Sequence, residues 1–467
     1  MHEQYKQKLY DWGLVRDAIA GESCIKRQNE LYLPMPSAMR AAPGPDSSIQ
    51  SYNATGMSLD AYYNNPNYHP IPAYQSYKTR AAFPEITGFF LRGLLGIATR
   101  KPPMLGLPPA FGYLGDGQRS LGRIFTATIS ELLQVGRHIL AIDVDADGDP
   151  IILSYNAEAL TDWACGYDEY GNEVVEYACL EEPSYCIDTD GERCECMNKR
   201  ILTLDSAGLY VCEKYDHDGV LLSTEQPLID GNPLHYVPIV IVGSTGVSAK
   251  IDISPLQPIA STAIHIYMKN ADISQSEFLS ASPTLIFSGM QRDEVPGVVG
   301  SGTAIALPNP AARAYYTTTD TSALQHLLNH VAQLYDQASA YGANLLGGAK
   351  KAAESGEALR LRQASAGATL VTVVQSAEQG IREALRIIAE WTDTEGLEFT
   401  AQTEFADVQL TAQDMAALLQ AWMGGAISQR TYLDNLRRGG VLGGDSVETE
   451  IDRIESAPPK VVQGGQF

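Results

Sequence analysis

The side chains best suited to chemistry in this sequence are cysteines. Six of the seven lie close together in the chain: Cys165, Cys179, Cys186, Cys194, Cys196 and Cys212. Zinc ligands usually come as Cys-x2-Cys pairs, whereas the closest pair here is Cys194-Glu195-Cys196, with His217 as a possible further ligand. Disulfides are unexpected in a reducing cytosol, although a released particle meets an oxidising medium. We predict free thiols on the strands of an irregular sheet and assign no metal, and a structural zinc site stays open as the alternative.

A second group of potential ligands is acidic. Asp143, Asp145 and Asp147 precede Gly148, as in the first half of a calcium-binding loop. The twelfth position of such a loop requires a bidentate Glu, and Ser154 stands there. Because apolar residues flank the acidic segment on both sides, it is better interpreted as an exposed turn between two strands.

The motifs of common catalytic sites are absent from the sequence. Residues 346–351 come nearest to a phosphate-binding loop but lack its spacing and its hydroxyl residue. Ser244 and Ser301 each have valine two positions earlier, where a nucleophile elbow requires glycine. His326 and His330 share a helix face, but Asn329 stands where a metalloprotease has its acid. We therefore expect a protein that is not an enzyme.

The charge of the chain limits how it can meet nucleic acid. The net charge is -23, whereas proteins that grip DNA gather Lys and Arg on one face to neutralise phosphates. If double-stranded DNA is a partner, we therefore expect it to move through the protein rather than to be bound tightly. The longest apolar stretch, residues 86–98, is shorter than the ~20 residues of a membrane span, and the N-terminus lacks a secretory signal pattern. We expect no membrane partner.

The elements that must position these residues change character near residue 250. At 467 residues the chain exceeds one ordinary core, so two or three units are expected. The first 250 residues are rich in Pro, Gly, Tyr and turn signals, which is typical of an irregular α+β unit. We predict strands at 138–144, 200–204 and 236–242 and helices at 86–98 and 120–135.

Long helices are predicted beyond residue 250. The first begins at the N-cap pair Ser254-Pro255 and ends before Pro283. A small Gly- and Pro-rich unit with strands at 284–287 and 304–307 follows, and then a helix that begins near 320–322 and ends at Gly347. The apolar stripes of the two helices are Leu256, Ile259, Ala263, Tyr267 and Ala271 in the first, and Leu324, Leu328, Val331, Tyr335, Ala338 and Leu345 in the second.

A polar loop at 347–356 separates these helices from a third one at 357–391. Gly367 and Gly380 are where this helix could bend, and its apolar stripe is Leu370, Val374, Ala377, Ile381, Leu385 and Ile388. Two short helices follow, one starting at the capping segment 411–414 and one at 428–438. Met415, Leu418, Leu419 and Trp422 form the apolar face of the first. The pair outlines a DNA-reading helix-turn-helix, but its second helix carries few cations, which favours packing.

The order of elements and the local sequence resemble one family of tailed-bacteriophage portal proteins along nearly the whole chain. No single piece is specific, but their order and spacing together are. The matching pieces are WGLVRDAIAGE at 12–22, YLP at 32–34, YKTRA at 77–81, GLLG at 93–96, RKPP at 100–103, VGR at 135–137, ID at 142–143, PIVIVG at 238–243, PL at 255–256, AD at 271–272, PT at 283–284 and SGEALR at 355–360.

This resemblance implies an α+β multidomain portal fold and a ring, typically of twelve subunits. The wing would be residues 1–250 with its Cys-rich sheet region at 160–215, and the stem helices would be 251–282 and 319–346, with the clip at 283–318 between them. The tunnel loop would be 347–357, the long connecting helix 358–395, and the short helical crown and tail 396–467. A long C-terminal barrel, present in some members, is not expected because the chain stops soon after Ile454.

The resemblance also implies site residues and partners. The tunnel loop would face double-stranded DNA without sequence specificity, and the clip would dock the terminase large subunit and the tail adaptor or head-completion protein. Major capsid and scaffolding proteins would be further partners, in a virion whose portal vertex is assembled in the host cytoplasm. The candidate tunnel-loop residues are Gly347, Gly348, Lys350, Lys351, Glu354, Gly356, Arg360 and Arg362, and the candidate clip residues are Gly289, Arg292, Asp293, Glu294, Pro296 and Arg313.

Two other functions remain open on sequence grounds. One is another virion assembly or head-completion protein, stapled by a metal in the cysteine-rich stretch. The other is a DNA-binding regulator that uses the helix pair at 411–438. A ring of subunits with a central hole favours the portal interpretation, whereas sequence preference among short duplexes favours the regulator.

Overall fold

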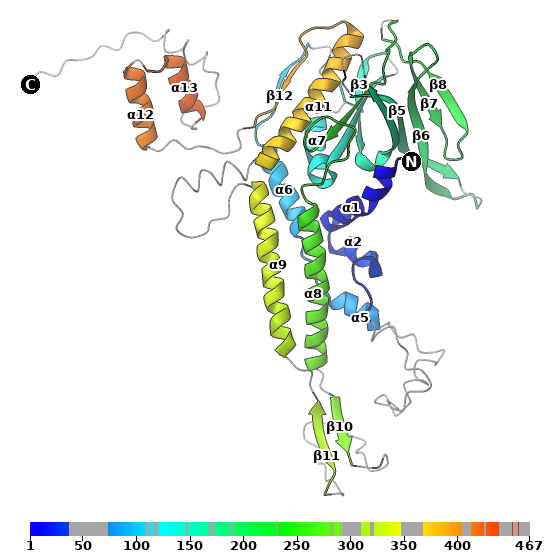
Figure 1. Ribbon diagram of the computed structural model, residues 1–467, viewed down its shortest axis with the longest axis vertical. Coiled ribbons are helices and arrows are strands. Elements are labelled where there is room, and N and C mark those ends of the chain that lie inside the picture. Colours follow the sequence, from blue (N-terminus) through cyan, green and yellow to red (C-terminus); the bar gives the residue numbers. More distant parts are fainter. Residues whose placement is uncertain are drawn as a thin grey trace, which may run out of the picture. The chain divides into compact units, whose positions relative to one another are not determined.

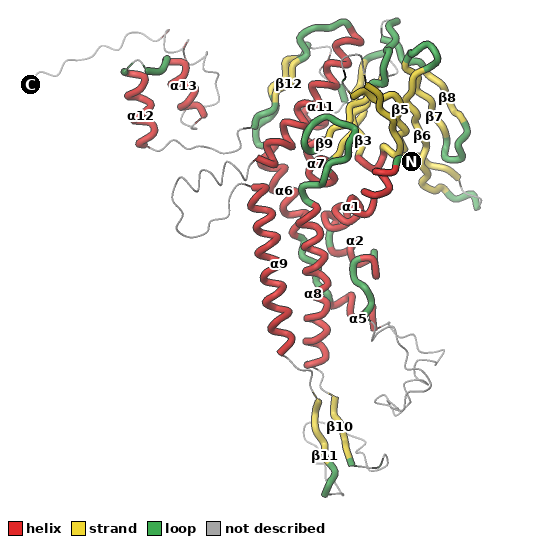
Figure 2. The backbone as a smooth tube through the Cα atoms, in the orientation of Figure 1, coloured by secondary structure: helices red, strands yellow, loops and turns green. Residues whose placement is uncertain are grey.

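The structure is a computed structural model of the chain, and its described part has an α+β architecture (Figures 1 and 2). Two compact units, Met1–Ala401 and Gln402–Phe467, are described separately below. None of the described helices combines the length and apolarity needed to cross a bilayer. The described residues are 1–36, 73–108, 111, 114–115, 120–145, 148–167, 171, 173–187, 190–229, 231–281, 284–289, 291, 310–317, 322–346, 368–403, 412–424, 426–438, 451 and 456.

Two antiparallel sheets carry most of the strands of the first unit. One has three strands in the order β3-β2-β9, and the other has five in sequence order from β4 to β8. The predicted turn after Asp143 is confirmed, since it joins β2 to β3. The strands are β2 Arg137–Val144, β3 Pro150–Asn156, β9 Ile239–Gly243, β4 Leu160–Tyr167, β5 Glu173–Ile187, β6 Arg193–Leu204, β7 Tyr210–Tyr215 and β8 Leu221–Glu225.

Helices α7 (Leu121–Val135) and α11 (Ala368–Thr392) pack against the three-stranded sheet. Strand β2 is buried from Arg137 to Ile142, because both of its faces are covered. The predicted apolar stripe of α11 is confirmed, since all six of its residues are buried. Strand β1 (Met104–Gly106) pairs with β12 (Glu398–Thr400), which brings the end of the unit back beside its first half.

A second helical layer is built around α8 (Gln257–Ala281), which contacts four other helices. The Ser254 hydroxyl accepts a hydrogen bond from the Gln257 amide at 3.1 Å, so the predicted N-cap is confirmed. The predicted stripe of α8 is buried along its whole length. The four helices are α1 Glu3–Ala20, α5 Ala73–Arg80, α6 Ile86–Ala98 and α9 Ser322–Leu346, and the short α2 Glu22–Arg27 and η1 Asn29–Leu31 follow α1 in the chain.

A two-stranded hairpin is inserted between α8 and α9. Strand β10 (Thr284–Ser288) pairs antiparallel with β11 (Arg313–Thr317). The first of these strands confirms the prediction at 284–287. The second was missed, because its alternation is short and follows a Gly- and Pro-rich stretch, and the strand predicted at 304–307 lies outside the described residues.

The second unit contains α12 (Ala412–Met423) and α13 (Gln429–Arg438), which pack on each other. The Ser428 hydroxyl caps α13 by accepting from the Thr431 amide at 3.1 Å. Trp422 stacks on Tyr432 with ring centroids 4.9 Å apart. Of the apolar face predicted for α12, Leu419 and Trp422 are more than a third exposed, so the two helices alone do not bury it.

Candidate functional site

The helix pair α8–α9 with its hairpin is the most distinctive part of the first unit (Figure 1). Each helix has 25 residues, which at 1.5 Å per residue gives about 38 Å. The chain leaves α8, forms the hairpin and returns along α9, so the two helices are antiparallel neighbours. A Cβ at Gly342 would collide with the ring of Phe90, which shows how closely the end of α9 approaches α6.

Helix α9 uses a different face for packing than its sequence predicted. Leu334 and Ala338 are buried against the rest of the unit, whereas Leu328 and Tyr335 are 43% and 41% exposed. The predicted stripe was wrong at these two positions, because a window with apolar residues on two adjacent faces fits more than one helical face. The side chain of Leu345 lies outside the described residues.

The residues left outside form a second apolar line along α9. Leu328, Ala332 and Tyr335 are all exposed, and their spacing of four and three residues places them on one helix face. We call these three residues the exposed stripe. The other side of the buried face carries polar residues, namely His326, His330, Gln333 and Gln337. Asp336 is the only residue of α9 that is charged at neutral pH, apart from any protonated histidine.

Further exposed apolar side chains lie at the hairpin end of the pair. Phe278 and Leu279, in the last turn of α8, are each 47% exposed, and Tyr315 and Tyr316 of β11 are 49% and 59% exposed. A scattered exposed Leu is ordinary, but a run of exposed apolar residues along one element marks an interaction surface.

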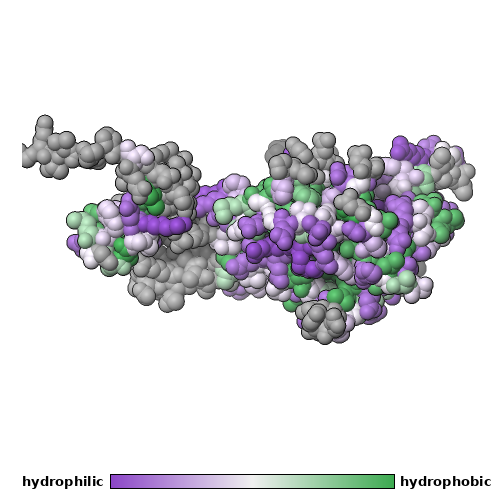
Figure 3. All heavy atoms as spheres, turned by 90° about the horizontal axis from the view of Figure 1, so that it is seen from above, coloured by the Kyte–Doolittle hydropathy of each residue, from purple (hydrophilic) through white to green (hydrophobic). Residues whose placement is uncertain are grey.

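On the face of the first unit formed by its sheets and α11, hydrophilic side chains gather near the centre with hydrophobic ones scattered around them (Figure 3).

The structure places two of the predicted clip residues near each other. Gly289 follows β10 with a φ of 74°, a conformation that favours glycine, and Arg313 begins β11 opposite Ser288. Both are exposed. Arg292, Asp293, Glu294 and Pro296 lie outside the described residues. So do all of the predicted tunnel-loop residues, from Gly347 to Arg362.

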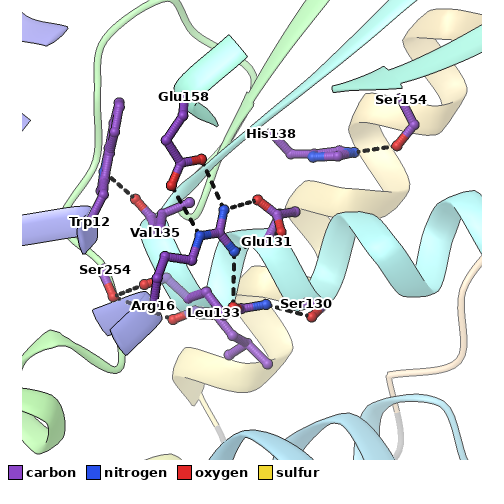
Figure 4. A network of polar contacts seen from close by, with 11 residues as sticks. Trp12, Arg16, Ser130, Glu131, Leu133, Val135, His138, Ser154, Glu158 and Ser254 are labelled. Atoms are coloured by element: carbon purple, nitrogen blue, oxygen red, sulfur yellow. Dashed lines mark hydrogen bonds and ion pairs between the residues drawn. The ribbon is translucent and has the colours of Figure 1, made fainter. Parts of the chain in front are cut away.

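Arg16 ties the first helix, α1, to α7 and to Glu158 next to the start of α8 (Figure 4). Its guanidinium reaches Glu131 of α7 at 2.6 Å and Glu158 at 3.0 Å, and it also bonds to Gln134. Burial alone would lower the pKa of Arg16, but the hydrogen bonds and charges of the two carboxylates raise it overall. The same region holds Ser254, whose hydroxyl donates to the Gln134 carbonyl at 2.5 Å. This junction fixes the entry of α8 relative to α1 and α7.

His138 lies in the same region but makes a different kind of contact. It is 2% exposed, and its Nε2 lies 3.0 Å from the Ser154 hydroxyl (Figure 4). Burial, together with the charge of Arg16, lowers the pKa of His138 to about 3. The ring is therefore neutral at physiological pH.

The acidic turn carries an ion pair. Arg200 of β6 contacts the Asp143 carboxylate at 2.5 Å and the Glu182 carboxylate at 3.0 Å. The carboxylate of Asp143, which would be the first ligand of a calcium loop, is thus paired with the guanidinium of Arg200. This ion pair connects the two sheets. The six clustered cysteines lie on strands β4 to β7, as predicted.

Comparison with known proteins gives a family match over part of the chain. Residues 255–392 match the family described as "Domain of unknown function (DUF4055)". This segment begins just before α8 and ends with α11, so it contains the helix pair and the hairpin. No curated protein matches the chain.

Solved structures similar to the chain include chains of gene transfer agent (GTA) particles. A chain of the virion of a native GTA particle is 14% identical, with 77% of this chain and 90% of that chain covered and a TM-score of 0.36. A chain in the neck of the empty particle, computed with C6 symmetry, is 13% identical, with 77% and 91% covered and a TM-score of 0.36. One in the neck of the native particle, computed with C12 symmetry, is 14% identical, with 75% and 89% covered and a TM-score of 0.36.

Proposed function

We propose that this chain is a structural subunit of a phage-like particle that assembles side by side into a closed ring, as a portal at the head–tail junction. The observation that carries the proposal is the exposed stripe on α9. A helix that already buries one face against its own unit, yet keeps Leu328 and Tyr335 outside, has an apolar surface left for a neighbour. The resemblance of the sequence to portal proteins points to the same assembly.

The position of the exposed stripe favours a ring over a two-fold dimer. The stripe lies on α9 beside the face that contacts α8, so it can meet a different surface on the next copy. Such a head-to-tail contact repeats with one rotation, and it closes into a ring where that rotation divides a full turn evenly. Helix α9 carries Asp336 as its only residue with a fixed charge, which keeps the desolvation cost of this contact small.

The charge of the chain fits a channel through which a duplex slides. Each phosphate neutralised by a protein cation adds a counterion-release contribution to binding. With a net charge of -23, a ring of these subunits would hold DNA weakly and let it travel. In this proposal the hairpin end docks the terminase motor during packaging and the tail adaptor afterwards, and the capsid proteins surround the wing. No chemical reaction is assigned to the chain.

Electron microscopy of the purified protein, with top views sorted by rotational symmetry, tests the proposal together with the mass in solution. We expect a ring with a central hole and a mass near twelve copies of the 50.6 kDa chain. Leu328→Asp combined with Tyr335→Asp should reduce the ring to monomers or short arcs, because two carboxylates would be buried in an apolar contact.

Gln333→Asp is the matched control. It adds a charge to the same helix but among its polar residues, so the ring should persist. A wild-type protein that stays monomeric, or a ring indifferent to both stripe substitutions, would contradict the proposal. A closed hexamer would favour a head-completion protein instead.

A further inference from the structure

Two cysteines and one histidine meet at one end of the five-stranded sheet, and a third cysteine lies beside one of them. Cys186 on β5 and Cys194 on β6 are direct cross-strand partners. Side chains of such partners lie on the same face of a sheet, and so does the side chain two residues further along. Cys196 therefore shares the face of Cys194. The Sγ atoms of Cys186 and Cys194 are 2.9 Å apart.

His217 reaches this group from the next strand pair. It lies in the turn between β7 and β8. One ligand atom each of Cys186, Cys196 and His217 lie within 4.8 Å of one another. Sequence spacing suggested Cys194, Cys196 and His217, but the contribution of Cys186 depends on the register of β5 against β6.

The turn that carries His217 is held by its own hydrogen bonds. The Asp216 carboxylate accepts from the Asp218 amide at 3.0 Å and from the Val220 amide at 2.8 Å. The backbone closes the turn as well, with the Gly219 amide donating to the Asp216 carbonyl at 3.1 Å. The imidazole is thus presented from a defined turn, which lowers the entropy lost when it binds a ligand.

We propose that Cys186, Cys196 and His217, with Cys194 as the fourth ligand, bind one zinc-type divalent cation. Structural zinc is tetrahedral with Zn–S bonds of about 2.3 Å, which places ligand sulfurs roughly 3.8 Å apart. On metal binding the sulfurs of Cys186 and Cys194 would move apart from 2.9 Å to this spacing. Thiolate and imidazole ligands select zinc over the hard cations calcium and magnesium.

A neighbouring carboxylate completes the arrangement. The Asp218 carboxylate lies 3.5 Å from His217 Nε2. Metal-binding histidines usually donate their second ring N–H to a carboxylate, which fixes the ring and raises its basicity. In our proposal Nε2 donates to Asp218 and Nδ1 binds the metal.

A disulfide between Cys186 and Cys194 is the competing use of these thiols. It would employ two of the four groups and leave Cys196 and His217 without a function. The metal uses all four and fastens the β7–β8 turn to β5 and β6, beyond the point where the β6–β7 ladder ends at Lys199 and Tyr215. Its role would be to hold the outer end of the sheet together.

Zinc content of the full-length protein tests the proposal. The protein is purified with a reductant, loaded with Zn²⁺, dialysed against a weak chelator and measured by elemental mass spectrometry. We expect one zinc per chain. Cys196→Ser and His217→Ala should each weaken zinc retention roughly tenfold or more, and Cys165→Ser, on β4 outside the group, should keep one zinc per chain.

Cobalt spectroscopy gives a second readout that does not depend on retention. Co²⁺ bound by thiolates in a tetrahedral site has strong sulfur-to-metal charge-transfer absorption and visible d–d bands. Both should appear with the wild type and with Cys165→Ser, and the charge transfer should weaken with Cys196→Ser. His217 is in an exposed turn, so His217→Ala keeps the test valid even where a cysteine variant fails to fold.

Several results would overturn the site. Reduced wild-type protein that takes up no zinc is one, and equal zinc retention by wild type and His217→Ala is another. A protein that forms only a Cys186–Cys194 disulfide, and binds no metal after reduction, would show that the competing use is the real one.

Discussion

At the scale of single residues, the junction at the start of α8 contains a half-buried base, Arg16, and a buried one, His138, that behave in opposite ways. Arg16 stays charged because Glu131 and Glu158 surround its guanidinium at hydrogen-bond distance. Within the described residues, His138 has only the neutral Ser154 hydroxyl as a partner for Nε2. Burial therefore acts unopposed on His138, and the nearby charge of Arg16 adds to its effect.

His138 should make the stability of the protein depend on pH. Its folded-state pKa of about 3 lies below the roughly 6.5 of an unfolded histidine. The unfolded chain then binds one more proton between these two values, so stability is full above pH ~6.5 and falls as the pH decreases. His138→Gln should remove about 1 kcal/mol of the loss that the wild type suffers between about pH 7 and 5.5.

Chemical denaturation at several pH values measures this difference. His265, exposed on α8, offers a matched control, and His265→Gln should leave the pH profile unchanged. Wild type and His138→Gln losing equal stability over this range would mean that His138 is not held neutral.

At the scale of elements, glycines have different uses in different helices. Gly380 was a predicted bend in the third long helix, but α11 runs unbroken from Ala368 to Thr392. A Cβ at Gly380 would collide with a methyl of Val242, which is fully buried on β9. The glycine thus permits close packing of helix on sheet. Gly93 of α6 is exposed, and a Cβ there would meet no atom of the described residues within 4 Å.

Alanine at these two positions should therefore have opposite effects. Gly380→Ala should destabilise the protein by about 1–2 kcal/mol, because overpacking against Val242 outweighs the better helix propensity. Gly93→Ala should stabilise it by up to about 1 kcal/mol through propensity alone. Denaturation midpoints of both variants check this, and a stabilising Gly380→Ala would show that α11 packs more loosely on β9 than its contact with Val242 implies.

At the scale of the whole molecule, the negative net charge favours a channel over a protein that reads DNA sequence. The net charge is -23, and the helix pair α12–α13 puts Trp422 and Tyr432 into a mutual stack. A regulator would instead direct several cations and polar side chains from one helix at base edges. Packing thus explains α12 and α13 better than base contacts do.

Short duplexes should bind weakly and without sequence preference. Fluorescence anisotropy with two duplexes of unrelated sequence should give equal, weak binding at low salt and none at physiological salt, since few counterions are released. A roughly tenfold preference for one duplex that Arg430→Ala abolishes would favour the regulator instead.

The sequence alone determined the long helices and much of the core, whereas α1 and several strands, among them β5, β7 and β11, were not predicted. Apolar periodicity was enough to predict α8, α11 and α6, the Ser254 cap and the turn after Asp143, because each depends on neighbours along the chain. The sequence also narrowed the possible functions, because its net charge and its lack of catalytic motifs can be read without coordinates. The predicted stripe on α9 was partly wrong, because periodicity identifies faces but not which face a partner covers.

Only the tertiary structure decided contacts between distant segments. Arg16 meets Glu131 and Glu158, which are 115 and 142 positions further along the chain, and Cys186 joins Cys196 and His217 through the register of neighbouring strands. A one-residue slip in that register would turn every side chain of β5 to the other face. Such pairings depend on how whole elements pack, and no local pattern in the chain encodes them.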